Sequence, residues 1–228
     1  MRTTPDGESA QPPRRPVAVR PLLALLALFS GIALLLNIVA RIDLRAALAT
    51  TLSVVVVGLA IVVRSAVSVE RRRIGRGIAV GVVAAFIATM AYDLSKAGLS
   101  VLDPSPYNPF HAIRVFGQLL AGSSAGETAI VTWGAAFHLL NGTMFGVAYV
   151  FLFARDGAIS IRAALGTGVG WGVFLEMFQL TLYPGWLDIR TYAEFATISA
   201  LGHIVYGATL GTIARSILRS SHDRRRVS

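Results

Sequence analysis

The chain is dominated by long apolar stretches that short polar or basic segments separate. Six of these stretches approach the ~20 residues that an α-helix needs to cross the ~30 Å hydrocarbon core of a bilayer. They are residues 20–40, 46–63, 76–98, 129–153, 163–183 and 195–215. Helices satisfy their own backbone hydrogen bonds, so they are the usual way to cross lipid. The pattern predicts an all-α fold, a polytopic membrane bundle of about six transmembrane helices.

The polar segments divide the chain into five parts. These are a polar tail (1–19), an N-terminal transmembrane hairpin (20–63), a basic cytoplasmic loop (64–75), a four-helix membrane core (76–215) and a basic cytoplasmic tail (216–228). The first tail is rich in Pro and Arg and has no apolar period, which is typical of disorder. Within the core we expect a long outer loop over 99–128, part of which can form a short amphipathic helix at the membrane surface.

Composition agrees with a chain that is solvated by lipid. Apolar residues make up 54% of the sequence and charged residues only 14%, whereas about a quarter of a soluble domain is charged. The net charge of +9 would suggest nucleic acid as a partner in a soluble protein. Here the basic residues flank apolar stretches, so we expect the lipid bilayer as the partner and no nucleic acid.

The basic residues also predict an orientation. With the N-terminus inside, sixteen of the 21 Lys and Arg residues lie in cytoplasmic segments. The outer segments hold Arg41, Arg45, Lys96, Arg114 and Arg190. Because cytoplasmic loops are enriched in Lys and Arg, both termini are expected in the cytoplasm. All but one of these residues are arginines, a usage typical of GC-rich bacteria, so we expect the bacterial plasma (inner) membrane.

Two of the predicted helices share a sequence motif. It reads Gly134-x3-His138-x3-Gly142-x3-Gly146 in the fourth helix and Ser199-x3-His203-x3-Gly207-x3-Gly211 in the sixth. Residues four apart lie on one face of a helix. Small residues on such a face let two helix backbones approach closely. Each motif therefore predicts a helix face of small residues that packs against another helix and also carries one histidine.

The third and fifth helices resemble each other as well. Glycines four apart open both of them, including Gly168 and Gly172 in the fifth, and each helix carries one acid further on, Asp93 or Glu176. Residues 76–153 and 163–215 therefore look like two hairpins of one plan, a parallel repeat. The glycine stripes at 142, 146, 207, 211, 168 and 172 are candidate packing surfaces within the chain, or for a second copy or another membrane protein.

Four ionisable residues lie in the outer half of the predicted membrane region, one on each helix of the core. They are Asp93, His138, Glu176 and His203. A charge at the centre of a bilayer costs at least about 2.5–3.5 kcal/mol, so these side chains must face the bundle interior, a water-filled cavity or one another. We expect His138, His203 and Glu176 to converge on a candidate polar site. Asp93 is further out and is also compatible with an interfacial position.

The core resembles a known group of proteins at four places. They are residues 81–90 (GVVAAFIATM), 108–110 (NPF), 138–149 (HLLNGTMFGVAY) and 202–211 (GHIVYGATLG). Over residues 76–215 the chain is similar to the YagU-like group of uncharacterised bacterial multi-pass inner-membrane proteins. The resemblance implies a four-helix membrane unit and supplies no catalytic residues. The two N-terminal helices lie outside it.

Three functions are compatible with these patterns. The first is a small transporter-like or proton- or ion-handling protein that uses the His/Glu/Asp cluster, because histidine titrates near physiological pH. The second is a redox protein with His138 and His203 as haem ligands, or with Glu176 as a third ligand to a metal. The third is a non-catalytic scaffold or assembly subunit, in which the histidines are structural.

Several kinds of chemistry are disfavoured. The chain has no cysteine, which excludes disulfides, thiolate metal ligands and cysteine nucleophiles. It carries no phosphate-binding loop, no serine in a nucleophile motif and no Asp-rich metal motif. No catalytic residue is therefore predicted, and the chain is expected not to be a hydrolytic enzyme.

Overall fold

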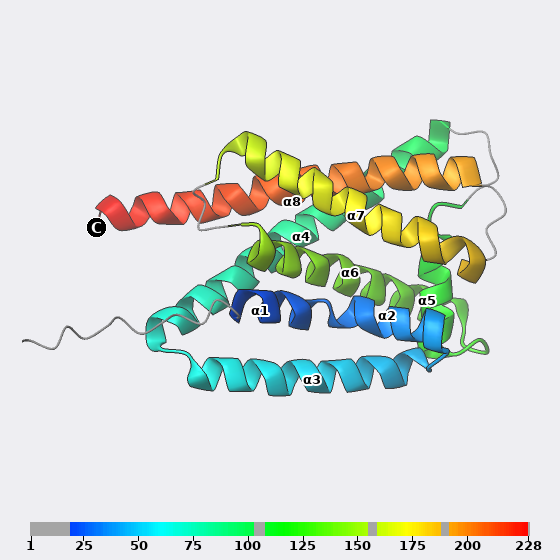
Figure 1. Cartoon of the computed structure of the whole chain (residues 1–228). Coiled ribbons are helices and arrows are strands. Elements are labelled where there is room, and N and C mark those ends of the chain that lie inside the picture. Colours follow the sequence, from blue (N-terminus) through cyan, green and yellow to red (C-terminus); the bar gives the residue numbers. More distant parts are fainter. Residues whose placement is uncertain (1–18, 103–107, 155–158, 188–191, 228) are drawn as a thin grey trace, which may run out of the picture.

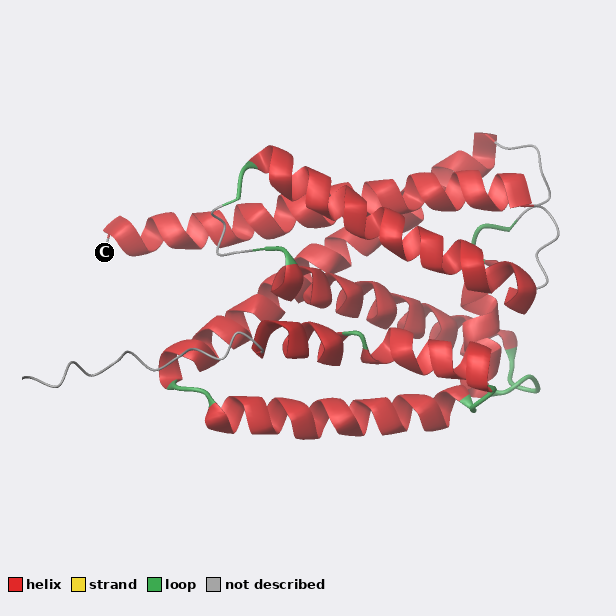
Figure 2. Cartoon of the chain, viewed as in Figure 1, coloured by secondary structure: helices red, strands yellow, loops and turns green. Residues whose placement is uncertain are grey.

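The computed structural model describes residues 19–102, 108–154, 159–187 and 192–227. Residues 1–18 of the predicted polar tail and residues 103–107 of the predicted outer loop lie outside these residues. Within them all regular secondary structure is helical, with no strand (Figures 1 and 2), which confirms the predicted all-α class. The helices are α1 (Val19–Ala27), α2 (Phe29–Ala40), α3 (Leu44–Ser65), α4 (Ser68–Leu102), α5 (His111–Ala121), α6 (Glu127–Leu152), α7 (Ile161–Leu187) and α8 (Tyr192–Val227).

Four helices in the described part of the chain are long and apolar enough to cross a membrane: α3, α4, α6 and the Thr197–Ser220 portion of α8. The pair α1–α2 forms a fifth span if it is counted as one helix bent by 55°. The predicted span 163–183 corresponds to α7, which has 27 residues, but its glycines together with Glu176 and Gln179 lower its mean hydropathy. It nevertheless packs along α8 through the bundle (Figure 1). The fold is a helical membrane bundle.

The N-terminal hairpin lies at the edge of this bundle. Its first span breaks at Leu28, next to a Ser30–Gly31 pair, and such pairs are common sites of helix kinks. The turn after α2 places Arg41 in the left-handed region, with φ of 58°. Asp43 then caps α3 by accepting the backbone N–H groups of Arg45 and Ala46. The Ala46 N–H contributes most to holding the pKa of the exposed Asp43 carboxyl below its ordinary value.

Two segments that were expected to be loops are mostly helical. Helix α4 begins at Ser68, so most of the basic segment 64–75 belongs to it, and α8 continues to Val227 through the predicted tail. Arginine is a good helix former, and a helix can continue into water beyond the lipid. At its other end α4 reaches Leu102, so the predicted outer loop starts later and contains α5, as expected.

The glycine stripe of α6 lies against α4. A side chain at Gly142 would collide with Thr89, and one at Gly146 would collide with Ala85. Thr89 and Ala85 are themselves almost fully buried. Close backbone approach at these two glycines therefore holds the first core hairpin together.

The second hairpin, α7–α8, is closed in the same way. A side chain at Gly168 would meet the carbonyl oxygen of Gly207, and one at Gly172 would meet that of His203. A side chain at Gly211 would likewise meet the carbonyl oxygen of Ala164. All six glycines predicted as packing positions thus face another helix of the same chain, so these faces are occupied before any second protein is considered.

Three arginines connect helix ends at the end of the bundle that carries the C-terminus (Figure 1). Arg20 donates to backbone carbonyls at the end of α6 at 3.1–3.4 Å. Arg76 donates to the carbonyl of Leu218, and Arg215 to that of Ile159, each at 2.8 Å. The last carbonyls of α6 lack partners within the helix, and Arg20 satisfies them, while Arg76 and Arg215 bind α8 to α4 and to the segment before α7.

The packing predicts different outcomes for two neighbouring glycines of α7. Gly168→Ala should destabilise the protein by about 1–3 kcal/mol, because the added methyl group would collide with the backbone of α8. Gly170→Ala is the matched control, because nothing lies within 4 Å of its added methyl group. Thermal unfolding of the detergent-purified variants measures both. Equal stability of the two variants would contradict the packing described for α7 and α8.

Candidate functional site

A cavity of about 80 Å³ lies between the four core helices and α5. Its polar lining comes from every one of these helices: Thr89, Tyr92, Asp93, Lys96, His111, His138, Asn141, Gln179, Tyr183, His203 and Tyr206. A cavity of this size and polarity has room for several water molecules or a small solute. Three of the four predicted site residues, Asp93, His138 and His203, line it, and Glu176 lies directly behind His203.

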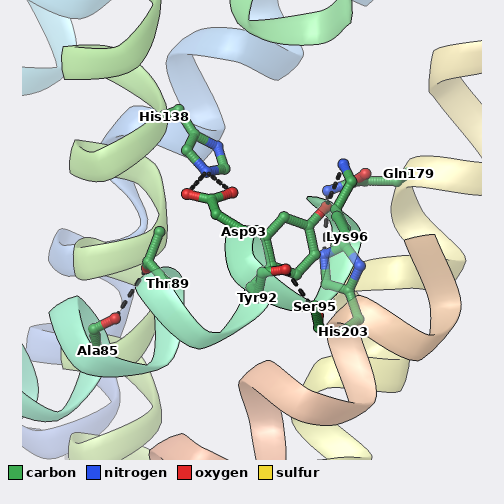
Figure 3. A network of polar contacts seen from close by, with 9 residues as sticks. All are labelled: Ala85, Thr89, Tyr92, Asp93, Ser95, Lys96, His138, Gln179 and His203. Carbon is green, nitrogen blue, oxygen red and sulfur yellow. Dashed lines mark hydrogen bonds and ion pairs between the residues drawn. The ribbon is translucent and has the colours of Figure 1, made fainter. Parts of the chain in front are cut away.

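Asp93 of α4 and His138 of α6 form the first acid–histidine pair. The His138 Nε2 lies 2.9 Å and 3.1 Å from the two carboxylate oxygens of Asp93 (Figure 3). The two side chains remain 20% and 23% exposed. Asp93 therefore belongs to the cluster rather than to the membrane interface, and this pair is the more accessible one.

Glu176 of α7 and His203 of α8 form the second pair, which is more deeply buried. The His203 Nδ1 lies 2.7 Å from the Glu176 Oε2, and the two side chains are only 7% and 6% exposed. The Ser199 hydroxyl donates to the same carboxylate oxygen at 2.7 Å. The other oxygen, Oε1, is buried without a hydrogen-bond partner among the described residues. Among the described residues, the Glu176 carboxylate is therefore bound through only one of its two oxygens.

The hydrogen bonds of His203 indicate which nitrogen carries its proton. Nδ1 also lies 3.0 Å from the backbone carbonyl oxygen of Ser199, which can only accept, so Nδ1 carries a hydrogen. On the other side of the ring, Nε2 lies 3.2 Å from the amide nitrogen of Gln179. With the amide in this orientation Nε2 accepts, which corresponds to a neutral imidazole. A second proton on His203 would require Gln179 to turn its oxygen toward the ring.

The two pairs follow the repeat that the sequence predicted. In each hairpin the acid comes from the outgoing helix and the histidine from the returning helix: Asp93 with His138, and Glu176 with His203. Each histidine is followed on its own helix by the two glycines that close its hairpin. The same helix contacts therefore set both the packing and the acid–histidine geometry.

Tyr92 lies between the two pairs (Figure 3). Its ring centroid is 6.0 Å from that of His138 and 4.8 Å from that of His203. Its hydroxyl accepts a hydrogen bond from Lys96 Nζ at 3.1 Å. The tyrosine links the histidines of the two hairpins through ring contacts, without a direct contact between the imidazoles.

Lys96 corrects the sequence analysis, which counted this residue among the outer segments. It lies in the last part of α4 and is 7% exposed, as its position inside the predicted span 76–98 already indicated. A signal was present: Lys96 is the only lysine in the chain and lies three residues after Asp93, on the same face of the helix.

The same spacing identifies the other polar residues that the sequence analysis missed. Each predicted site residue is followed three positions later by another residue that lines the cavity: Lys96, Asn141, Gln179 and Tyr206. Tyr206 donates its hydroxyl hydrogen to the carbonyl oxygen of Gly142 at 2.7 Å, across the two hairpins. Asn141 is buried, and its Oδ1 has no partner in the described part of the chain.

The arrangement does not fit the metal and haem alternatives. Among the described residues, no three His, Asp or Glu side chains lie close enough together to hold a metal ion. His138, His203 and Glu176 are therefore not a ligand triad. For haem, two axial imidazoles must face each other across the macrocycle, whereas the Tyr92 ring occupies the space between these two.

Comparison with protein-family models, with curated proteins and with solved structures gives no match. Function is therefore inferred from the cavity and the residues around it.

The burial of the two pairs predicts different coupling energies. In a double-mutant cycle of Glu176→Leu and His203→Leu, we expect a coupling free energy of about 1–3 kcal/mol, because either single change leaves a buried polar group alone. The cycle of Asp93→Leu and His138→Leu is the internal control, and its coupling should be smaller because that pair is more exposed. Equilibrium unfolding of the purified variants gives both values. Coupling that is larger for the exposed pair would refute this ranking.

Proposed function

We propose that this chain is a small transporter-like protein of the bacterial plasma membrane that takes up protons at an intramembrane cavity and moves them across the bilayer. The observation that carries the proposal is the pair of acid–histidine contacts, Asp93–His138 and Glu176–His203, which meet at one cavity. Histidine changes its charge near physiological pH. Ionisable groups inside a membrane bundle commonly mark a proton or ion pathway.

The graded burial of the two pairs supports this proposal. The half-buried pair can exchange protons with water more readily than the pair that is more than nine-tenths buried. Tyr92 and Lys96 lie between the pairs and add further groups that can donate or accept hydrogen bonds. The cavity thus offers successive proton sites that differ in solvent access.

Gln179 supplies a second line of support. Its amide can turn so that either its nitrogen or its oxygen faces the His203 Nε2, which lies 3.2 Å from the nitrogen in the structure. One orientation suits a neutral imidazole and the other an imidazolium. A single side-chain rotation can therefore accommodate both protonation states, which a structural histidine does not require.

A multi-pass topology with both termini in the cytoplasm belongs to the same proposal, as does membership of the YagU-like group. The excess of basic residues in the predicted inner segments supports the orientation. Arg20, Arg76 and Arg215 lie together at the end of the bundle from which α8 extends, whereas the cavity lies beside α5. The cavity would then face the outer side.

Proton movement can be measured with protein reconstituted into liposomes that contain a pH-sensitive dye. Wild-type liposomes should dissipate an imposed pH gradient faster than empty ones, and Glu176→Gln should lower the rate at least about tenfold, because it removes the proton-accepting partner of His203. Glu127→Gln, an exposed acid outside the cavity, is the matched control and should keep the wild-type rate. Wild-type rates no higher than those of empty liposomes would refute the proposed function.

The orientation can be tested because the chain has no cysteine of its own. Ser124→Cys, in the exposed turn after α5, should react in intact cells with a maleimide that does not cross membranes. Ser68→Cys, at the start of α4, should react only after the cells are broken. The opposite labelling pattern would show that the topology is inverted.

A further inference from the structure

Lys96 has more hydrogen-bonding capacity than its surroundings use. A lysine ammonium carries three N–H donors, and the one hydrogen bond that the Lys96 Nζ makes to a described residue goes to the Tyr92 hydroxyl at 3.1 Å. In the described ranges no carboxylate forms an ion pair with it. A charge that is more than nine-tenths buried is normally paired. The wall of the cavity therefore presents a cation without its partner.

The contacts that do surround the ammonium are mostly aromatic. Its nitrogen lies 4.8 Å from the ring centroid of Tyr92 and 5.7 Å from that of Phe110. Such rings attract a cation but accept no strong hydrogen bond. A second buried polar atom at the same cavity, the Asn141 Oδ1, also lacks a partner among the residues described. Of these two groups only the Lys96 ammonium can donate a hydrogen bond to an anion inside the cavity, because an amide oxygen only accepts.

The carboxylates near Lys96 form their ion pairs with the histidines instead. Both oxygens of Asp93 face His138, and Glu176 binds Ser199 and His203 through Oε2 without lining the cavity. The titratable groups around Lys96 are Tyr92 and Asp93 on α4, His111 on α5, His138 on α6, Glu176 and Tyr183 on α7, and His203 and Tyr206 on α8. With neutral histidines the two acids outweigh the single lysine, so an added anion needs protons on the histidines.

The size and remaining walls of the cavity limit the ligand. The volume of about 80 Å³ is roughly half that of a ~150 Å³ cavity that accepts benzene. Apolar side chains, including Phe116, Phe145 and Leu175, form part of the lining. A suitable ligand therefore has about five non-hydrogen atoms, one anionic end for Lys96 and a short apolar end.

We propose that the cavity binds a short-chain monocarboxylate, of the size of propionate, with its carboxylate on the Lys96 ammonium. This inference rests on the proposed function, because the histidine pairs supply the protons that accompany the anion. Protonation of His138 or His203 adds positive charge beside Lys96. The anion therefore binds more tightly as the pH falls, provided that the pH stays above the pKa of the carboxylic acid itself.

The test measures binding of radiolabelled propionate to the detergent-purified full-length protein at about pH 7.5 and about pH 6.0, a range that histidine spans. We expect saturable binding that is tighter at the lower pH by up to about 30-fold, the limit that the uptake of one proton per anion sets between these two pH values. Lys96→Met, which keeps the length of the side chain, should weaken binding at least about tenfold. Arg114→Met, which removes an exposed cation on α5 that pairs with Glu127, should bind like wild type.

A ligand comparison keeps the test independent of how well the variants fold. Propionamide has nearly the shape of propionate without its charge, so it should compete at least about tenfold less well for the wild-type protein. Equal competition by the amide, or unchanged binding by a folded Lys96→Met variant, would overturn the carboxylate site. Wild-type protein that carries protons in liposomes but binds no propionate would refute this inference alone. Binding without proton movement would instead refute the proposed function.

Discussion

The cost of placing an ionisable side chain in hydrocarbon organises the core of this protein. Each core helix carries one member of an acid–histidine pair, and each pair forms across its own hairpin, Asp93 with His138 and Glu176 with His203. Pairing at 2.7–2.9 Å requires helix backbones that lie close together, and the glycine stripes allow this approach. Gly172 lies against the backbone carbonyl of His203, one turn from the acid that binds the same histidine. The same close approach of the helix backbones therefore serves both the packing of each hairpin and the contact between its acid and its histidine.

Hydropathy predicted the fold because lipid permits few alternatives to the helix. It was less accurate where a helix leaves the lipid or carries polar residues. Most of the basic segment 64–75 and the end of the chain continue as helix, since arginine is compatible with helix in water and an apolar pattern cannot detect that continuation. Helix α7 shows the opposite case: Glu176 and Gln179 lower its apolar character because they belong to the polar centre of the bundle.

The candidate site was predicted in part. The energetic cost of buried charge identified its four ionisable residues, and the repeat indicated that they belong to equivalent hairpins. The residues three positions later were missed, because single polar residues inside an apolar stretch carry little weight in hydropathy. Lys96 was misplaced because it was counted with the outer segments, although it lies inside the apolar stretch 76–98. Helical periodicity applied to the ionisable residues themselves, rather than to the apolar ones, would have found all four.

The repeat is not symmetric at the cavity, and this asymmetry bears on the direction of proton movement. His138 meets its acid through Nε2 and remains about one-fifth exposed, whereas His203 uses Nδ1 and is more than nine-tenths buried. The Asp93–His138 pair is therefore the more accessible of the two. On the proposed function, a proton from the outside then reaches the Asp93–His138 pair first. Lys96 raises the cost of a further positive charge, so a bound anion would lower the barrier between the two pairs.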